Sequence, residues 1–173
     1  LNGDDRTMIG SPIPDFVYGF NFDFTYGNWD LSIGLQGQVG NEIFNGKNVV
    51  RPDPYNFEQH VWNRWTGEGT STSFPRVTTG PNSNSLFSDF FVENGSFVRL
   101  QNIQFGYTFG ENTLKGSGID KLRFYFSASN LVTLTKYRGF DPTTSNGAPI
   151  GGGIDQGFYP SPKTFLIGLN VNF

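Results

Sequence analysis

Between residues 16 and 26 the chain alternates strictly between aromatic residues and smaller, mostly polar ones. The aromatic residues are Phe16, Tyr18, Phe20, Phe22, Phe24 and Tyr26. The residues between them are Val17, Gly19, Asn21, Asp23 and Thr25. Because successive side chains of a β-strand point to opposite faces, this pattern predicts a strand with one aromatic face and one largely polar face.

The same alternation returns in further segments up to the last residue, Phe173. We therefore expect an all-β chain with five antiparallel strands, at residues 15–26, 29–40, 95–109, 121–134 and 164–173. Gly27 and Asn28 fit a two-residue hairpin loop, since both residue types tolerate positive φ angles. Near the start of the third strand the alternation fails, because Arg99 and Gln101 fall on its apolar side.

The connections between the expected strands alternate in length. Residues 27–28 and 110–119 make short turns, whereas residues 41–94 and 135–161 make long loops. Successive connections of antiparallel strands lie at opposite ends of a sheet. One end therefore carries short turns and the other long loops, an asymmetry typical of outer-membrane barrels.

A short helix is expected inside the first long loop. Phe57, Val61 and Trp65 are spaced so that they would share one face of a helix over residues 57–65. The rest of that loop is rich in Ser, Thr, Gly, Asn and Pro, which favours irregular structure.

A transmembrane β-barrel wall, with lipid on one side and water on the other, explains an alternation that recurs in every strand. The apolar side would contact outer-membrane lipid and the polar side a water-filled lumen. Five strands do not close a barrel, and an open sheet edge in hydrocarbon leaves backbone groups unpaired. We therefore expect these strands to be the end of a longer polypeptide and to pair with the rest of its barrel.

Large aromatic residues gather at the short-turn end of the expected sheet, where a membrane–water interface would lie. They are Tyr26, Trp29, Tyr107, Phe109, Phe124 and Phe173. Residues 97–101, which break the alternation, lie toward the other end, and we place them beyond the hydrocarbon layer.

Composition narrows the classes of function. The net charge is −3 and the pI about 5.0, so the chain has no basic surface for nucleic acid. It has no Cys and a single His, His60, so thiolate zinc sites, His-based metal sites and catalytic triads have no support. Asp141 and Asp155 offer oxygen ligands, but their spacing matches no EF-hand loop and favours turns. We expect no enzyme, no metal and no cofactor.

Six stretches, in order and covering nearly the whole chain, carry a family resemblance. They are IGSPIPDF (9–16), WTGEGTS (65–71), VENGSFVRL (92–100), SNLVTLTKY (129–137), GFDP (139–142) and GIDQGFYP (153–160). Together they resemble the C-terminal part of the SusC/RagA-type TonB-dependent outer-membrane transporters of Bacteroidetes.

The resemblance implies a barrel of about 22 strands, of which these are the last five. It also implies a plug domain and a TonB-contacting segment, neither of which lies within these residues. Transporters of this type pair with a SusD-like surface lipoprotein that acts as a lid, and they import oligosaccharides or peptides using TonB and the proton gradient. Phe173, at the end of an alternating strand, resembles the signal that the barrel-assembly machinery reads.

Two groups of residues are candidate sites. Those expected to face the lumen are Asp23, Asp30, Gln36, Gln38, Arg123 and Tyr125. They would make the channel wall hydrophilic or touch the plug, and contact with cargo is the less favoured role. Those expected in the long loops are Trp62, Arg64, Trp65, Tyr137 and Tyr159. Their rings can stack on sugars, although loop packing or contact with the lid is favoured.

Two alternative functions remain at this stage. A SusC-like barrel can serve as a structural scaffold in a larger outer-membrane complex, with the same pattern of residues. A soluble β-sandwich that binds glycans would also have strands with one apolar face, buried against a second sheet.

Arginine substitutions test which face meets lipid. Phe22→Arg or Leu169→Arg, made in the full-length protein, should destabilise the barrel by ~2–4 kcal/mol, as expected for a cation near the bilayer midplane. Asn21→Arg should be nearly harmless, because its neighbours on that face are solvated. The measurement is the denaturant midpoint of the heat-modifiable band on a gel, and equal damage at all three positions contradicts the face assignment.

Overall fold

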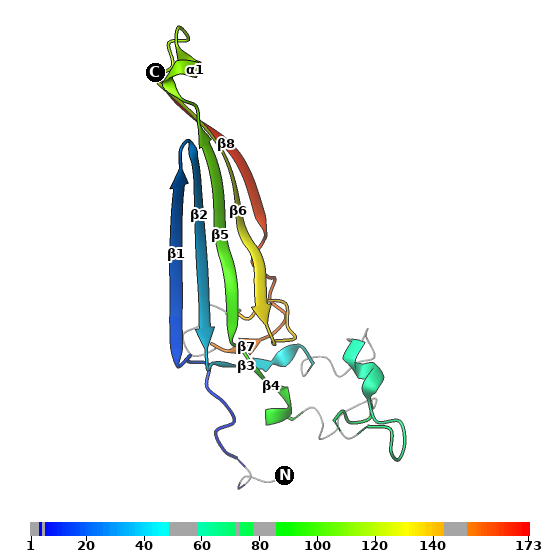
Figure 1. The fold of residues 1–173 in the computed structure, drawn as a ribbon. Coiled ribbons are helices and arrows are strands. Elements are labelled where there is room, and N and C mark those ends of the chain that lie inside the picture. Colours follow the sequence, from blue (N-terminus) through cyan, green and yellow to red (C-terminus); the bar gives the residue numbers. More distant parts are fainter. Residues whose placement is uncertain (1–3, 5, 49–58, 72, 78–85, 144–151) are drawn as a thin grey trace.

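A computed structural model of the chain describes residues 4, 6–48, 59–71, 73–77, 86–143 and 152–173. Its central feature is an antiparallel sheet of five long strands, which forms a tall, curved wall in Figure 1. The strand order is β1-β2-β5-β6-β8. The strands run Phe16–Tyr26 (β1), Trp29–Val39 (β2), Phe97–Thr108 (β5), Lys121–Thr135 (β6) and Thr164–Asn172 (β8).

The observed strands end within two residues of the expected ranges, and the all-β fold class is confirmed. β1 and β2 pair without interruption from Phe16 opposite Val39 to Tyr26 opposite Trp29. Gly27 closes this hairpin at φ +56, a backbone conformation that hairpin turns of this length require. Each further strand pairs with the next in the same antiparallel way.

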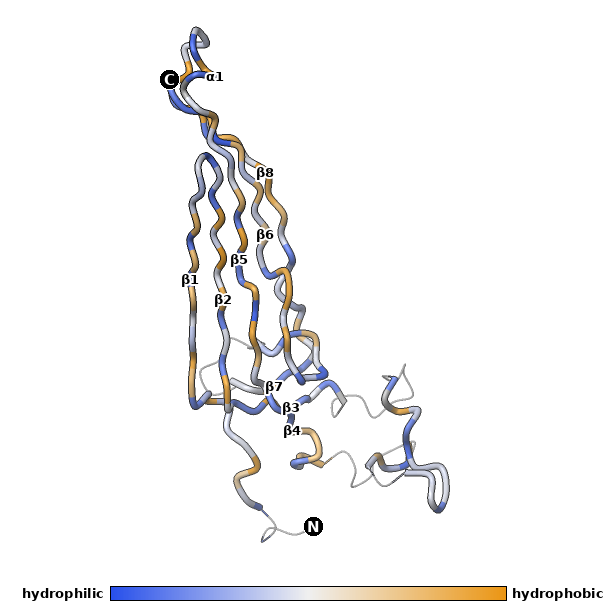
Figure 2. Tube along the Cα trace, viewed as in Figure 1, coloured by the Kyte–Doolittle hydropathy of each residue, from blue (hydrophilic) through white to orange (hydrophobic). Residues whose placement is uncertain are grey.

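The two faces of the large sheet differ as the alternation predicts, and Figure 2 shows hydrophilic and hydrophobic residues following one another along each strand. Phe20, Phe105 and Leu169 lie on the apolar face and remain 52%, 46% and 63% exposed. Large side chains on this face are thus left uncovered by the described residues. No second sheet among the described residues packs on this face to form the dry interior of a β-sandwich, so the described structure contradicts that alternative.

A β-bulge in β5 corrects one prediction. The pairing of β2 with β5 shifts between Gly34 and Leu35, because Gln101 is an extra residue on the β5 side. Such a bulge exchanges the two faces of a strand. Arg99 therefore pairs with Gln36 on the polar face, and the prediction that Arg99 lies on the apolar side is wrong.

The neighbouring strand β6 accommodates this bulge. Its register with β5 also shifts, between Leu100 and Asn102. Close by, Asn130 has a φ of 55, a left-handed conformation that Asn tolerates better than most residues. Its amide Nδ2 donates a hydrogen bond of 3.1 Å to the carbonyl oxygen of Pro162, which ties β6 to the segment before β8.

A small sheet of three short strands lies at the long-loop end, beyond the last residues of β2 and the first residues of β5 (Figure 1). Its order is β4-β3-β7, with β3 at Glu42–Asn45, β4 at Val92–Asn94 and β7 at Ile154–Asp155. β4 pairs antiparallel and β7 parallel to β3. We call this sheet and the segments packed on it the loop-end assembly; it comprises residues 9–12, 41–48, 86–96, 136–143 and 152–161.

The loop-end assembly, not the large sheet, contains most of the buried apolar side chains among the described residues. They are Ile43, Phe44, Phe91 and Tyr137, whereas Phe97 and Ala128 are buried in strands of the large sheet. Fully burying a large apolar side chain contributes about 1.5–3 kcal/mol. The long loops, expected to be irregular, thus fold in part into a packed unit.

Helical structure is slight in the described residues. The 3₁₀ helices are η2 (Gly46–Asn48), η3 (Gln59–Asn63) and η5 (Asp89–Phe91), and the single α-helix is α1 (Glu111–Leu114). None of the helices described is long and apolar enough to cross a membrane.

The helix expected over residues 57–65 is wrong in type for the part that the structure describes, residues 59–65. There η3 is a 3₁₀ helix, and Trp65 lies beyond its end, with its backbone N–H donating to the carbonyl oxygen of Phe74. Phe57 lies outside the described residues. A 3₁₀ turn does not keep residues four apart on one face, so the i, i+4, i+8 spacing of these aromatics was coincidental.

Deleting Gln101 tests the bulge. Removing this extra residue leaves Leu100 opposite Leu35 and Arg99 opposite Gln36, so we expect the folded, heat-modifiable fraction of the full-length protein to stay nearly unchanged. Deleting Leu100 together with Gln101 should instead place Arg99 and Phe97 on the apolar face and expose them to lipid, so that fraction should fall sharply. Equal assembly of the two deletion variants would show that the residue count at this point does not set the faces of β5.

Candidate functional site

The polar face of the large sheet brings together the six residues expected to face a lumen. Asp30, Gln36 and Gln38 alternate along β2, and Arg123 and Tyr125 occupy the same face of β6. Asp23, on β1, pairs with Ser32 on this face as well. The sequence pattern therefore grouped these side chains on the face where the structure places them.

An ion pair crosses the polar face near the short-turn end. The Arg123 guanidinium donates from Nε to Oδ1 of Asp30 at 2.9 Å and from Nη2 to Oδ2 at 2.5 Å. The two residues belong to β6 and β2, and β5 runs between them with Gly106 at the crossing point. A Cβ at Gly106 would lie 2.6 Å from both Asp30 Oδ1 and Arg123 Nη2, so glycine makes room for the pair.

Tyr125 completes this part of the face. The Arg123 guanidinium lies 5.1 Å from the centre of the Tyr125 ring, within cation–π range. The Tyr125 ring in turn lies over Gly168 of β8, where a Cβ would come within 2.5 Å of its hydroxyl oxygen. These contacts give the short-turn end of the polar face a fixed, charged and aromatic surface.

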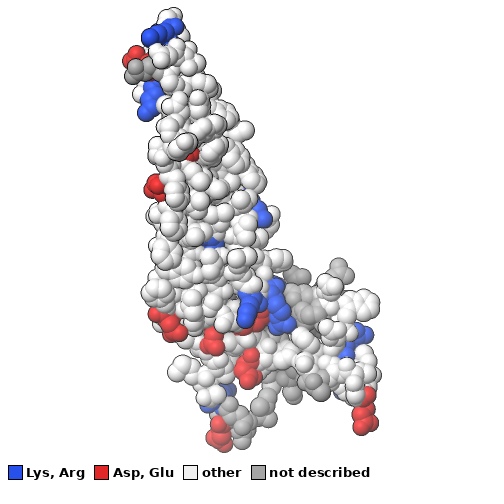
Figure 3. Space-filling view, in the orientation of Figure 1, with Lys and Arg blue, Asp and Glu red and all other residues white. Residues whose placement is uncertain are grey.

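Neutral side chains occupy the middle of the same face. One row across four strands consists of Asn21, Gly34, Asn102 and Ser129. Amide and hydroxyl groups offer both donors and acceptors to a passing solute without attracting either sign of charge. In the view of Figure 3, too, charged groups gather mainly at the two ends of the molecule, and the surface between them is mostly uncharged.

The five loop residues expected to contact cargo or lid have different surroundings. Trp62, Trp65 and Tyr159 are 81%, 41% and 92% exposed. Arg64 donates at 3.4 Å to the carbonyl oxygen of Val61, within its own turn. Tyr137, by contrast, is only 5% exposed and so is not available to a partner on the surface.

Tyr137 has a structural role inside the loop-end assembly. Its hydroxyl donates a 2.5 Å hydrogen bond to Oδ2 of the fully buried Asp155. Oδ1 of Asp155 accepts the backbone N–H groups of Gly157 and Phe158, at 2.7 and 3.2 Å. Asp155 thus organises the turn after β7, as favoured from its sequence context.

A buried ion pair joins the wall to the last loop, and sequence reasoning missed it. Arg99 Nη2 lies 2.5 Å from Oδ1 of Asp141, and the side chains are only 8% and 7% exposed. Arg99 also donates to Thr133 and Thr143 at 2.9 and 3.3 Å. The pattern hid this pair because Arg99 reaches the polar face only through the bulge at Gln101.

The environment of Asp141 favours its charged form. Burial alone would raise its pKa, but hydrogen bonds from the hydroxyl and N–H of Thr143, the N–H of Ser161 and the Arg99 guanidinium outweigh burial. Together they hold the pKa of Asp141 well below its ordinary value of 3.8. Asp141 is therefore a turn-forming anion that neutralises Arg99.

Glu93 forms a second polar cluster on β4. Burial raises its pKa, but hydrogen bonds from the side chain and N–H of Arg138, and from Asn45 Nδ2, have the larger combined effect and lower it. The Arg138–Glu93 distance is 2.9 Å, with the arginine 44% exposed. β4 is thereby tied both to β3 and to the loop that follows β6.

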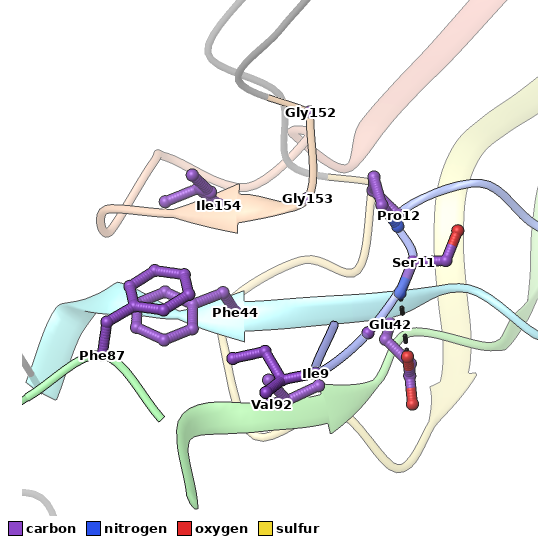
Figure 4. Close-up of a pocket in the computed structure, with 11 residues that line it drawn as sticks. Ile9, Ser11, Pro12, Glu42, Phe44, Phe87, Val92, Gly152, Gly153 and Ile154 are labelled. Atoms are coloured by element: carbon purple, nitrogen blue, oxygen red, sulfur yellow. Dashed lines mark hydrogen bonds between the residues drawn. The ribbon is translucent and has the colours of Figure 1, made fainter. Parts of the chain in front are cut away.

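A small cavity of about 140 Å³ lies on the side of β3 that carries Glu42 and Phe44, opposite the side where Asn45 meets Glu93. Figure 4 shows Phe44, Val92 and Ile154 along one side, with Glu42 beside the segment that contains Ser11. Glu42 Oε2 accepts the N–H of Ser11 at 2.9 Å. The cavity is mostly apolar, and its one carboxylate is engaged in holding the chain that enters the first strand.

Phe173 follows β8 and is 86% exposed at the short-turn end. In the described part of the chain no three His, Cys, Asp or Glu side chains come together in a way that would hold a metal ion. The described residues thus form a sheet with one polar face, joined at one end to a hydrogen-bonded loop-end assembly.

Curated relatives cover the whole chain. No family model matches it. TonB-dependent receptor P3 of Formosa agariphila is 36% identical over 98% of this chain, and TonB-dependent receptor P26 of the same organism is 33% identical over 100%. TonB-dependent receptor SusC of Bacteroides thetaiotaomicron is 28% identical over 100%. The chain spans only 17%, 18% and 16% of their lengths.

Solved structures agree in fold. The structure of the RagAB peptide transporter matches 100% of this chain with a TM-score of 0.80 and 26% identity. The RagAB peptide importer in its open-open state matches 93% with a TM-score of 0.74 and 27% identity. The chain covers 19% and 17% of those matched chains, so the wall described above is a portion of a larger barrel.

Neutralising Asp141 should loosen the loop-end assembly selectively. Asp141→Asn in the full-length protein leaves Arg99 buried without a counter-ion, which typically costs about 3–5 kcal/mol. We expect faster hydrogen exchange over residues 136–143 and intact strands. Asp89→Asn, at an exposed carboxylate, is the matched control. It should change neither the hydrogen exchange of residues 136–143 nor that of the strands.

The same contacts predict that the stability of the folded loops depends on pH. Because the pKa values of Asp141 and Glu93 are lower in the folded state than their ordinary 3.8 and 4.5, the unfolded state binds more protons. Their stabilising contribution is therefore present above about pH 4.5 and is lost progressively as the pH falls below it. Pepsin cleavage of the loops should rise over that window, and less steeply in Asp141→Asn; identical profiles would contradict this role.

Proposed function

Because the chain belongs to the SusC/RagA type of TonB-dependent receptors, we propose that it forms the last five strands of a plugged barrel of about 22 strands in the outer membrane of a Gram-negative bacterium. The whole protein imports a bulky nutrient, either an oligosaccharide or a peptide. TonB drives this import through a preceding part of the polypeptide.

The observation that carries the proposal is the contrast between the two faces of the large sheet. Phe20, Phe105 and Leu169 would be a liability in water but suit contact with acyl chains. On the other face, the Asp30–Arg123 pair and the row of amides and hydroxyls suit a water-filled passage. A single sheet that suits lipid on one face and water on the other is typical of the wall of a membrane barrel.

The polar face supplies a surface for plug and cargo. Asp30, Arg123 and Tyr125 lie at the short-turn end, which faces the periplasm in barrels of this kind. Their fixed geometry suits a plug that packs against them. The neutral row around Asn102 is better suited to a solute that slides past, since amides and hydroxyls exchange hydrogen bonds with sugars or peptide groups readily.

The loop-end assembly supports the lid contact. Trp62, Trp65 and Tyr159 are exposed aromatic side chains on the long-loop side, and such residues supply large contact areas at interfaces. The partner we propose is a SusD-like surface lipoprotein. The similarity to the RagAB peptide importer supports this choice of partner.

Cysteine substitutions on adjacent positions of β5 test the proposal. Asn102→Cys should react with a membrane-impermeant maleimide, whereas Ile103→Cys should not, because lipid covers it. A bulky maleimide at Asn102 should also slow uptake. The measurement is growth and labelled uptake on starch oligosaccharides or on a casein peptide digest, in cells whose only copy is the full-length variant.

The same cells separate transport from the scaffold alternative. Import requires TonB, so uptake should stop when TonB is deleted or the proton gradient is collapsed. Normal nutrient uptake without the protein, together with loss of a larger membrane complex, would favour a scaffold. Equal labelling of Asn102→Cys and Ile103→Cys would contradict the barrel wall itself.

A further inference from the structure

A groove of about 390 Å³ opens on the apolar face of the large sheet, at its short-turn end. Six aromatic rings line it: Trp29, Phe105, Tyr107, Phe109, Phe124 and Phe126. They come from β2, β5 and β6, and from the residue that follows β5. The volume lies at the small end of the range for specific ligand sites, roughly 300–1,000 Å³.

The rings that form the groove hold one another in place. Trp29 stacks on Phe105, with ring centres 5.0 Å apart and planes at 17°. Tyr107 lies 4.5 Å from Trp29 and meets Phe109 edge-on at 5.1 Å. Packed aromatic pairs are favourable beyond their buried area. The groove is therefore preformed, yet Trp29, Phe105 and Phe124 stay 46%, 46% and 43% exposed.

Closing the barrel does not cover this groove. β2, β5 and β6 are the three central strands of the sheet and already have both neighbours. Additional strands would attach outside β1 and β8, at the two free edges. Whatever fills the groove must come from outside the barrel, and the apolar surface that surrounds it continues along the whole face.

Polar groups at the short-turn end of the groove have balanced charge. Asn28 Nδ2 donates to the Tyr107 hydroxyl at 3.5 Å, next to the groove. The connection from residue 109 to residue 120, with the first residue of β6, carries Glu111, Lys115, Asp120 and Lys121, two anions and two cations. A head group with one charge of each sign complements this end better than a purely anionic one.

We propose that the groove binds one acyl chain of a zwitterionic phospholipid, whose head group lies against the connection between β5 and β6. This inference rests on the proposed function, since it requires the apolar face to lie in a membrane. A rigid hollow in hydrocarbon loses the dispersion contacts of its lining unless a chain enters it. The stacked rings offer one chain a longer residence than the flat surface around them.

Photo-crosslinking in native outer membranes tests this site. p-Benzoylphenylalanine replaces either Phe109, which lines the groove, or Phe22, which lies on the same apolar face outside it, in the full-length protein. After irradiation, mass spectrometry should find a phosphatidylethanolamine adduct at position 109 at a level at least about tenfold that at position 22, the difference expected of a bound over a passing lipid.

Removing the stacked wall provides a second measurement. Trp29→Ala combined with Phe105→Ala should reduce the adduct at position 109 to the level at position 22. Phe16→Ala combined with Phe20→Ala, on the same face but outside the groove, should leave it unchanged. The heat-modifiable band on a gel shows that each variant has assembled.

Three results overturn the proposal, and they are distinguishable. Equal lipid adducts at both positions in an assembled barrel show only a general lipid annulus. A protein adduct at position 109 shows that a second protein covers the groove. Absence of lipid at both positions in a chain without heat modifiability overturns the barrel wall, and the groove with it.

Discussion

Lateral pairing of the backbone in a fixed register is the constraint on which this structure depends. Each strand of the large sheet can keep its apolar side chains on one face only if its neighbours hold it in register, because a slip of one residue exchanges the faces. β1 and β2 satisfy this over their full length. β5 satisfies it with one extra residue, Gln101, which brings Arg99 back to the polar side.

Glycines in one strand leave room for side chains of a neighbouring strand to reach across it. Tyr18 lies over Gly37 and reaches toward the carbonyl oxygen of Phe97, two strands away. Gly106 in the same way lets the Asp30–Arg123 pair span β5. Cross-strand contacts of this kind stabilise a sheet that has little apolar core of its own. The Asp30–Arg123 contact also fixes two charged groups on the polar face.

Stability and function are divided between the two ends of the chain. The large sheet leaves large apolar side chains exposed among the described residues, and in the proposed barrel lipid and further strands would cover them. The loop-end assembly instead has buried apolar side chains and two hydrogen-bonded acidic centres, Asp141 and Asp155. A firm support of this kind is what an exposed aromatic side chain on the assembly, such as Tyr159, requires if it is to meet a partner in a defined geometry.

The sequence by itself determined the five strands, their two faces and the polar set from Asp23 to Tyr125, because a period of two residues is written directly in the chain. The resemblance in its motifs also indicated the family. Only the tertiary structure decided the bulge at Gln101, the Arg99–Asp141 pair, the burial of Tyr137 and the aromatic groove. These depend on which residues of distant segments lie opposite one another, and a local pattern does not contain that information.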